Sequence, residues 1–462
     1  MKRVSAFYPI LLVIFPILSL YAYNIEEVSA RDLAFPLLIA IAGVLILLLL
    51  LRLVIKSRNK IALVVTWLVV LFFSYGYVRD VVFDDAKVSL KPNVILLSVW
   101  FVLLIIEVFL VLRARRDFDV FTKFLRAATI ALVVVVVVFV GVGVVGLERV
   151  ERGETGETVA VADSPDIYYI VLDMYTSNNA LRELLDYDNS EFTDSLADKG
   201  FFVAVESHSN YRTTYISTAS CLNMDYLSRD RSVLEAFGMV EDSEASRFLR
   251  ARGYRYVYVS GGVDFRNMKR YADVRTYKGA FGFGISAFLE GLCDTTVLAP
   301  FARALGGLYG ANAVLYAFDA LAEIPDIEES TFVYAHVLCP HPPWFFTVDG
   351  PRDLNIFGPS QDEMVKEGYL GNLEYINMRV DALIDGILSK SDIPPIIILQ
   401  GDHGLWWVEE QTQHYEILNA YYLSDGGSTL LYNSISPVNS FRVIFNHYFG
   451  TDYKLLEDRR EE

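Results

Sequence analysis

The sequence predicts an N-terminal bundle of five transmembrane helices followed by an α/β domain with a mostly parallel central sheet. Long apolar runs are confined to the first third of the chain, and short strands alternate with helices after Pro165. The charge changes at the same place, because residues 1–146 hold 15 basic and 9 acidic side chains while the remainder holds 25 and 48. A basic apolar segment therefore precedes an acidic, water-soluble one.

Composition excludes several classes of protein. Hydrophobic residues make up 53% of the 462, too many for a disordered chain. Three cysteines, with no CxxC pair, provide neither a disulfide framework nor a zinc knuckle. A net charge of −17 argues against a nucleic-acid partner.

Five apolar runs fill the first segment, each close to the ~20 residues that cross a bilayer as a helix. Glu107 and Arg52 are the charged residues inside them, which disfavours a transporter. A cleavable signal peptide is the alternative for the first run, but no small-residue cleavage site follows it and four more runs come after. The runs are 5–23, 33–55, 61–78, 93–112 and 127–146.

The basic residues of the connections predict the orientation. Lys and Arg are concentrated at the N-terminus, as Lys2 and Arg3, and in the loops near 52–60 and 113–126. This places these three segments in the cytoplasm. An odd number of spans then places everything after Gly146 outside the cytoplasm. We expect a multi-pass protein of the cell membrane with the lipid bilayer as a partner.

Residues 147–164 are charged and aperiodic and predict a linker, followed by a domain over 165–462. Short apolar runs bounded by turn residues predict strands in this domain, and helical stretches lie between them. The predicted strands are 166–172, 200–205, 254–260, 331–338 and 395–399, and the predicted helices include 179–185, 243–252 and 361–388.

Three of these strands deliver ionisable side chains to one end of the sheet. Asp173 follows the first, Asp402 and His403 follow the last, and the strand at 331–338 contains His336 and leads to His341. Ligands bind beyond the carboxyl ends of parallel strands. Mixed carboxylate and imidazole ligands favour Zn²⁺ or Mn²⁺, whereas an all-oxygen site would favour Mg²⁺ or Ca²⁺. Each residue alone has a structural alternative, a turn or cap for Asp and a satisfied buried ring for His.

At these residues the sequence resembles the sulfatase-like branch of the alkaline-phosphatase superfamily, which includes lipoteichoic acid synthases and phosphoethanolamine transferases. The resemblance covers roughly 165–453, and the five-helix anchor resembles that of the synthases. It implies an alkaline-phosphatase-like fold. It also implies a divalent metal ion held by Asp173, Asp402, His403 and the oxygen of a nucleophilic Thr214.

Thr214 matches the family pattern because Ser217 and Ser220 follow at the expected spacings, and Thr213 remains an alternative nucleophile. His341 is implied as the proton donor to the leaving group or as a hydrogen-bond donor to a non-bridging phosphoryl oxygen. His336 is implied to support substrate or a second ion, and Asn210 to contribute an amide donor.

Two departures from the family pattern bear on the reaction. Cys221 lacks the Pro/Ala and Arg that formylglycine sulfatases need after the cysteine, which favours phosphoryl chemistry on a threonine. His414 lies in a stretch that is not diagnostic of the downstream family histidine. We interpret His208 and His447 as structural residues.

The resulting hypothesis is a membrane-anchored, metal-dependent hydrolase or transferase. It would act on phosphodiesters of lipid or surface-glycan head groups through a phospho-threonine intermediate. The alternatives are a sulfatase and a catalytically silent protein that binds surface polymer. Five aromatic residues near the metal motifs could contact a sugar or the bilayer, or could be core: Trp344, Phe345, Phe346, Trp406 and Trp407.

Overall fold

A computed structural model provides the fold. The structure describes residues 8–23, 33–82, 90–150, 164–228, 231–263, 268–276, 287–352, 365–408, 411–423, 425 and 427–461. The chain divides into two compact units, each described by itself. The first comprises Met1–Thr155, Gly279–Gly306 and Leu354–Ser360, and the second comprises Gly156–Lys278, Gly307–Asp353 and Gln361–Glu462.

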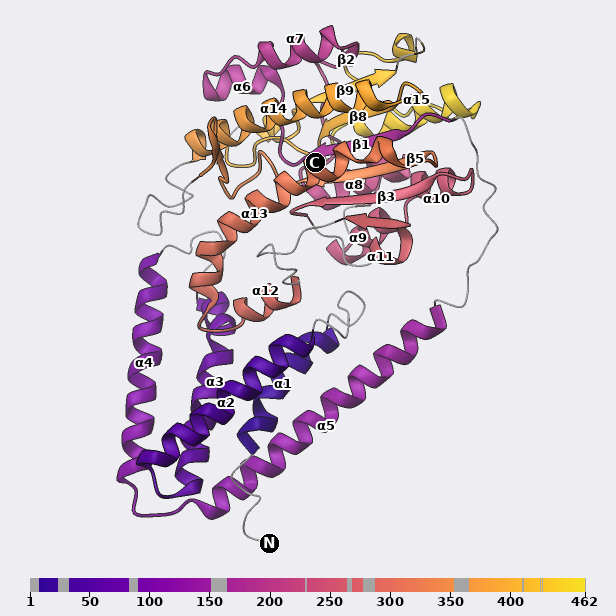
Figure 1. The fold of residues 1–462 in the computed structure, drawn as a ribbon. Helices are drawn as coiled ribbons and strands as arrows, with labels where there is room; N and C mark the ends of the chain where they lie inside the picture. The colour runs from indigo at the N-terminus through magenta and orange to yellow at the C-terminus, as the bar shows by residue number, and fades with distance from the viewer. Residues whose placement is uncertain are drawn as a thin grey trace. The chain divides into compact units, whose positions relative to one another are not determined.

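The first unit is helical (Figure 1). Helix α1 contacts α2, α3 and α5, and α3 also contacts α4. The five helices are α1 (Tyr8–Tyr23), α2 (Ala34–Val54), α3 (Arg58–Val82), α4 (Leu90–Arg113) and α5 (Asp119–Val150). Each overlaps one of the predicted apolar runs, so the sequence located all five.

Four of these helices, α2 to α5, are long and apolar enough to cross a membrane. Helix α1 is apolar but has 16 described residues, below the ~20 that span a hydrocarbon core. Two predicted boundaries are wrong in detail. Helix α5 begins at Asp119, so Lys123 and Arg126 lie in its first turns rather than in the preceding loop. It also continues through Val150, into the predicted linker 147–164, of which 151–163 lie outside the described residues.

A segment from the second half of the sequence packs within this helical unit. Phe288 and Leu292 of α12 (Ala287–Asp294) join the apolar core formed by α1, α2 and α3. The backbone N–H of Gly76 in α3 donates to the Thr295 carbonyl at 3.1 Å. A side chain at Gly76 would prevent this approach, because its Cβ would lie 2.0 Å from the Asp294 carbonyl oxygen. The predicted domains 1–146 and 165–462 stay a prediction, and α12 belongs with the first unit.

The second unit contains a seven-stranded sheet in the order β2-β9-β8-β1-β5-β3-β4. Strand β1 pairs in parallel with both β5 and β8, while β9 runs antiparallel to β8 and β2. The predicted mostly parallel α/β architecture is confirmed. The strands are β1 (Ile167–Leu172), β2 (Phe201–Val203), β3 (Arg255–Gly261), β4 (Val274–Thr276), β5 (Thr331–Val337), β8 (Ile396–Gly401) and β9 (Asn419–Leu423).

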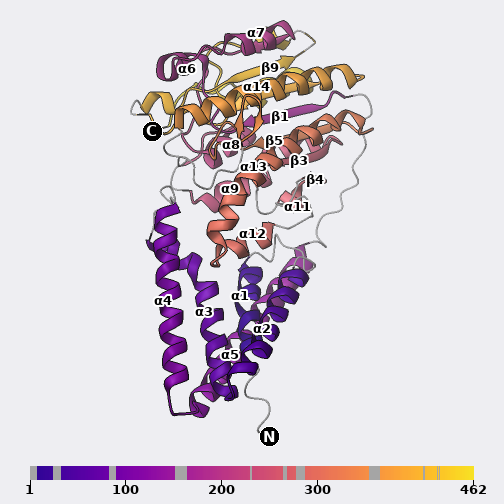
Figure 2. The ribbon, with the colours of Figure 1, turned by 60° about the vertical axis from the view of Figure 1, so that its left-hand side comes forward.

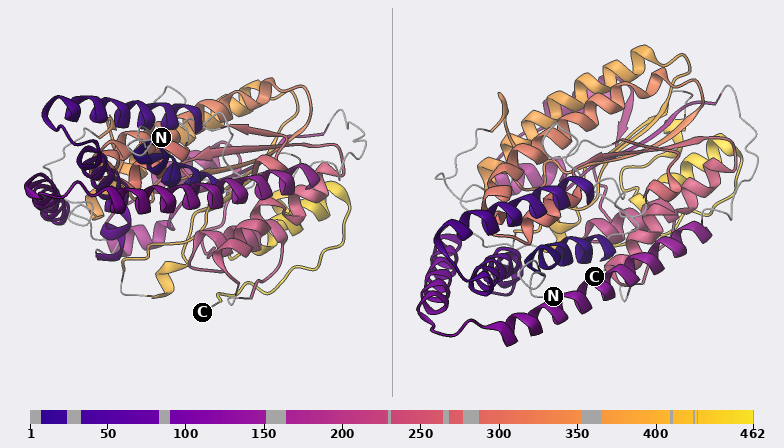
Figure 3. Two further views of the ribbon diagram at one scale, coloured as in Figure 1. Left: turned by 90° about the horizontal axis from the view of Figure 1, so that it is seen from below. Right: turned by 60° about the horizontal axis from the view of Figure 1, so that its bottom comes forward.

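Helices cover both faces of this sheet, which is why its central strands are apolar on both sides (Figures 2 and 3). In β1, Tyr168, Ile170 and Leu172 face one helical layer, and the alternate residues face the other. The first layer contains α6 (Asn178–Leu185), α7 (Ser190–Asp198), α13 (Ala299–Ala322) and α14 (Val365–Lys390). The second contains α8 (Thr214–Asn223), α9 (Val233–Glu241), α10 (Glu244–Arg250) and α15 (Pro437–Phe449).

Smaller elements complete the second unit. They are a two-stranded ribbon of β6 (Phe346–Thr347) and β7 (Gly350–Pro351), the short helix α11 (Met268–Tyr271) and the 3₁₀ turns at Ile324–Asp326, Gln411–His414 and Gly427–Leu430.

Candidate metal centre

Two carboxylates meet at the carboxyl ends of β1 and β8. Leu172 pairs with Gly401, so the residues that follow, Asp173 and Asp402, lie side by side. Both are 2% exposed, and His403 is 5% exposed. The predicted convergence of Asp173, Asp402 and His403 is therefore present in the structure.

The Asp402 carboxylate is held by the backbone, and each of the two carboxylates keeps one oxygen without a hydrogen bond. Asp402 Oδ1 accepts from the N–H groups of Met174 at 2.9 Å and His403 at 3.0 Å. Within the described part of the chain, Asp402 Oδ2 and Asp173 Oδ1 are buried and have no hydrogen-bond partner. A buried ionised oxygen is costly to leave unpaired, so these atoms favour a cation as their partner.

The ring of His403 is oriented to supply a third ligand atom. Its Nδ1 lies 2.9 Å from the Gly404 carbonyl oxygen, which can only accept, so Nδ1 carries the proton. The lone pair is then on Nε2, which lies 3.6 Å from Asp173 Oδ1 and 3.7 Å from Asp402 Oδ2. Ligands at the ~2.1 Å typical of Zn²⁺ sites are separated by roughly 3.4 Å in a tetrahedron. The distances from His403 Nε2 to the two carboxylate oxygens are therefore compatible with ligands of one divalent cation.

The pocket also carries an excess of negative charge. Burial raises the pKa of Asp173, but the neighbouring rings of His341, His336 and His403 outweigh it and lower the pKa to about 2. Burial lowers the pKa of His403, but Asp402 and Asp173 outweigh it and hold this pKa above its ordinary value. Asp173 thus stays ionised across the physiological range, and its negative charge favours a cation.

The predicted nucleophile, Thr214, lies at the start of a helix that is fixed to the cluster of Asp173, Asp402 and His403. Helix α8 begins at Thr214, with Thr213 as its extended N-cap residue. One turn later, the Ser217 hydroxyl donates to the Asp402 carbonyl oxygen at 2.6 Å. Thr214 is half-buried and Thr213 is exposed. The N-terminus of α8, which favours anions, is therefore anchored beside the carboxylate cluster.

The two histidines of the predicted His-x-x-x-Pro-His element occupy different places. His341 is half-buried, its backbone N–H donates to the Asp173 carbonyl at 3.1 Å, and its ring centre lies 6.4 Å from that of His403. His336 is fully buried within β5, and its Nε2 lies 3.3 Å from Asp173 Oδ2. Ligand atoms of Asp173, His336 and Asp402 lie within 4.8 Å of one another, so His336 contacts the cluster itself.

Asn210 does not face this cluster. It is 1% exposed, and its amide nitrogen donates to Ser436 Oγ at 3.0 Å and to the Arg459 carbonyl at 2.9 Å. Its Oδ1 accepts from the Val438 N–H at 3.0 Å. The side chain thus contacts α15 and the segment that follows it, and the substrate contact predicted for Asn210 stays a prediction.

Other singled-out side chains also have structural partners. Cys221 is fully buried within α8, away from any exposed surface. His447 Nε2 pairs with Asp425 at 2.9 Å and His414 Nε2 lies 2.9 Å from the Val408 carbonyl. His208 forms an isolated bridge with Glu416. The structural interpretation of His447 and His208 is consistent with these contacts.

Four of the five aromatic residues near the metal motifs belong wholly or partly to the core. Trp344, Phe345 and Phe346 are at most 4% exposed, and Trp407 packs edge-on against Trp344 with ring centres 5.9 Å apart. Trp406 is 52% exposed and follows His403 by three residues. Trp406 is therefore the member of this set that is available to a substrate or a membrane surface.

We expect Trp406→Ala and Trp407→Ala to separate binding from stability. The first should raise KM for a lipid-like phosphodiester severalfold while the unfolding free energy changes by less than ~1 kcal/mol, because the ring is exposed. The second should destabilise the protein by ~2–4 kcal/mol through lost packing. Thermal unfolding measures the change in stability, and steady-state kinetics measure KM. An unchanged KM in Trp406→Ala would show that Trp406 does not contact the substrate.

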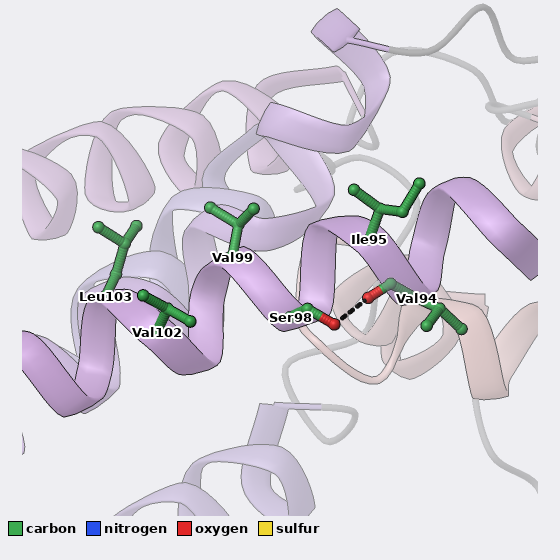
Figure 4. Close-up of a pocket in the computed structure, with 6 residues that line it drawn as sticks. All are labelled: Val94, Ile95, Ser98, Val99, Val102 and Leu103. Carbon is green, nitrogen blue, oxygen red and sulfur yellow. Dashed lines mark hydrogen bonds between the residues drawn. The ribbon is translucent and has the colours of Figure 1, made fainter.

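A hollow on α4 is lined by apolar side chains and one serine, unlike the charged metal centre (Figure 4). Its polar side chain, Ser98, donates its hydroxyl to the Val94 carbonyl within the same helix. Such a surface suits hydrocarbon chains and offers nothing that would recognise a phosphate. It is lined by Val94, Ile95, Ser98, Val99, Val102 and Leu103.

No protein-family model and no curated protein sequence matches this chain. Solved structures are similar to it in fold. The phosphoethanolamine transferase EptA from Neisseria meningitidis is 13% identical, with a TM-score of 0.42 and coverage of 96% of this chain and 95% of that one. The periplasmic domain of EptC from Escherichia coli is 11% identical, with a TM-score of 0.43 and coverage of 64% and 85%.

A third similar structure is the lipoteichoic acid synthase LtaP from Listeria monocytogenes. It is 13% identical, with a TM-score of 0.38 and coverage of 57% of this chain and 69% of that one. Phosphoethanolamine transferases and lipoteichoic acid synthases are also the proteins that the sequence resemblance named. At these identities the similarity concerns the fold alone, so the chemistry rests on the residues of this chain.

Proposed function

We propose that this chain is a membrane-anchored, metal-dependent enzyme that transfers or hydrolyses phosphodiester groups through a phospho-threonine intermediate on Thr214. The observation that carries the proposal is a group of three neighbouring ligand atoms, Asp173 Oδ1, Asp402 Oδ2 and His403 Nε2. The two oxygens have no hydrogen-bond partner among the described residues, and His403 Nδ1 faces the Gly404 carbonyl. They lie beside the helix that begins with the predicted nucleophile. Zn²⁺ or Mn²⁺ suits this mixed oxygen and nitrogen set best, and Mg²⁺ or Ca²⁺ less well.

A divalent cation held by these residues would lower the pKa of a neighbouring hydroxyl and withdraw charge from a phosphoryl oxygen. Thr214 Oγ1, having lost its proton to solvent, would form a bond to phosphorus while the bond to the leaving oxygen breaks, and a proton from His341 would neutralise that oxygen. Water or an acceptor hydroxyl gives its proton to His341 and breaks the Thr214–phosphorus bond. The identity of that acceptor separates a hydrolase from a transferase.

The substrate class follows from the location that we propose. An α/β domain tied to the membrane by four or five spans would meet lipid and glycan head groups first. The similar structures EptA, a lipooligosaccharide phosphoethanolamine transferase, and LtaP, a lipoteichoic acid synthase, motivate a lipid-borne phosphodiester donor.

Orientation is part of the proposal. The basic residues before α1, between α2 and α3 and after α4 support a cytoplasmic N-terminus and an extracytoplasmic α/β domain. A reporter that is active only outside the cytoplasm should work when fused after Glu462 and fail when fused at the α2–α3 connection near Lys56. The reverse result would contradict the orientation.

The proposal is tested on the full chain in detergent with bis(p-nitrophenyl) phosphate as probe. We expect about one Zn²⁺ or Mn²⁺ per chain by elemental analysis, nitrophenol release that stops on chelation, and a phosphoryl adduct on Thr214 by tandem mass spectrometry. p-Nitrophenyl sulfate should not be a substrate, because the buried Cys221 lacks the formylglycine context. Bound metal without turnover of either ester would instead support a silent polymer-binding protein.

A further inference from the structure

Behind the cluster lies a buried pair of side chains, Tyr334 and His336, that the reaction above does not use. Both lie in β5 two residues apart, so both point to the same face of the sheet, the face covered by α8. Both are fully buried. Tyr334 Oη lies 2.8 Å from His336 Nδ1, and His336 Nε2 lies 3.3 Å from Asp173 Oδ2.

We propose that Tyr334 and His336 are positioning residues that aim Asp173 at the cation, with His336 as a hydrogen-bond donor and not as a metal ligand. This inference rests on the proposed function, because it concerns the same metal centre. It differs from the role that the resemblance implied for His336, a contact for substrate or a second ion.

The direction of the hydrogen bonds supports this assignment. An ionised carboxylate oxygen can only accept, so, as a hydrogen bond, the contact with Asp173 Oδ2 places the proton of His336 on Nε2. The lone pair of the neutral ring is then on Nδ1, where the Tyr334 hydroxyl donates to it. A nitrogen that carries a proton cannot bind a metal. The tautomer is thus opposite to that of His403, whose Nε2 has the free lone pair.

The position of His336 within the strand agrees with this. It pairs with Val171, two residues before Asp173, so it approaches the carboxylate from inside the sheet. Asp173 and Asp402 each follow the last residue of a strand, and His403 comes next. Because His336 occupies Oδ2 of Asp173, the other oxygen is left facing His403 Nε2 at 3.6 Å. Outer-shell hydrogen bonds of this kind change metal affinity by about 10–100-fold.

The experiment compares Mn²⁺ affinity of the metal-stripped full chain in variants that keep the ring packing. Tyr334→Phe removes one oxygen and retains the stack with Tyr169, whose ring centre lies 5.6 Å away. It should weaken Mn²⁺ binding about tenfold. Tyr258→Phe is the matched control, because Tyr258 packs beside Tyr334 and donates to the Val263 carbonyl, outside the cluster. It should bind Mn²⁺ like the wild type.

His336 is tested by counting nitrogens on the bound Mn²⁺. Electron spin echo modulation should detect one imidazole nitrogen, from His403, in the wild type and equally in His336→Gln. His336→Gln, which retains an amide donor, should bind Mn²⁺ more tightly than His336→Leu. A second imidazole nitrogen that disappears in His336→Gln would make His336 a ligand and overturn the inference, as would a Tyr334→Phe affinity equal to that of Tyr258→Phe. If the wild type binds no cation, the proposed function itself fails.

Discussion

Thr214→Ala is expected to lower phosphodiester turnover by about 10⁴-fold or more, because removal of a nucleophile leaves only the catalysis that binding and the remaining groups supply. The side chain is half-buried at the first position of α8, so the substitution should change the unfolding free energy by less than ~1 kcal/mol. Metal content should remain near that of the wild type, since Asp173, Asp402 and His403 are intact. Turnover, elemental analysis and thermal unfolding of the same preparation separate these effects.

Thr213 and a serine replacement provide the controls. Thr213 is exposed and its side chain makes no capping hydrogen bond to α8, so Thr213→Ala should leave turnover within about threefold. Thr214→Ser keeps a hydroxyl at the same place and should retain measurable turnover with an adduct on the new side chain. Loss of turnover in Thr213→Ala together with full activity in Thr214→Ala would transfer the nucleophile to Thr213.

Much of the fold could be predicted because its signals are local. The apolar runs located all five N-terminal helices, and the short runs at 166–172, 331–338 and 395–399 match β1, β5 and β8 within two residues. Strand β9 was missed because Asn419–Leu423 is short and follows an irregular segment without a strong turn signal. The packing of α12 with the helical unit could not be predicted, because it depends on a close approach at Gly76 rather than on any pattern in α12.

The candidate site could also be predicted only in part from the sequence. Asp173, Asp402 and His403 could be predicted because each lies next to the end of a parallel strand, and the register of neighbouring strands brings such residues together. Which nitrogen of His403 or His336 carries the proton could not be predicted, because it depends on the carbonyl, carboxylate or hydroxyl that each ring meets. The hydrogen-bond partners of Asn210 could not be predicted either, because Ser436 and Arg459 are more than two hundred residues away.

The second large effect is expected from Asp402→Asn. This variant should be more stable than the wild type without metal and less stable than the wild type with metal. In the wild type without metal, Asp402 Oδ2 and Asp173 Oδ1 are buried carboxylate oxygens without hydrogen-bond partners among the described residues, an arrangement that costs free energy. The amide oxygen of the variant can keep the bonds from the Met174 and His403 N–H groups. Its amide nitrogen then faces the cluster without a charge, so the metal-free variant should be ~1–2 kcal/mol more stable than the metal-free wild type.

Adding Zn²⁺ or Mn²⁺ should invert this order. At a metal concentration 100 times the dissociation constant, binding stabilises the wild type by about 2.7 kcal/mol. The variant should bind at least ~100-fold more weakly because it lacks a charged ligand, so it should gain less than ~1 kcal/mol. Asp319→Asn, at an exposed pair with Arg379, is the matched control and should follow the wild type with and without metal. Denaturant unfolding of the three proteins measures the inversion, and a wild type whose stability does not respond to metal would show that the unpaired carboxylate oxygens do not form a cation site.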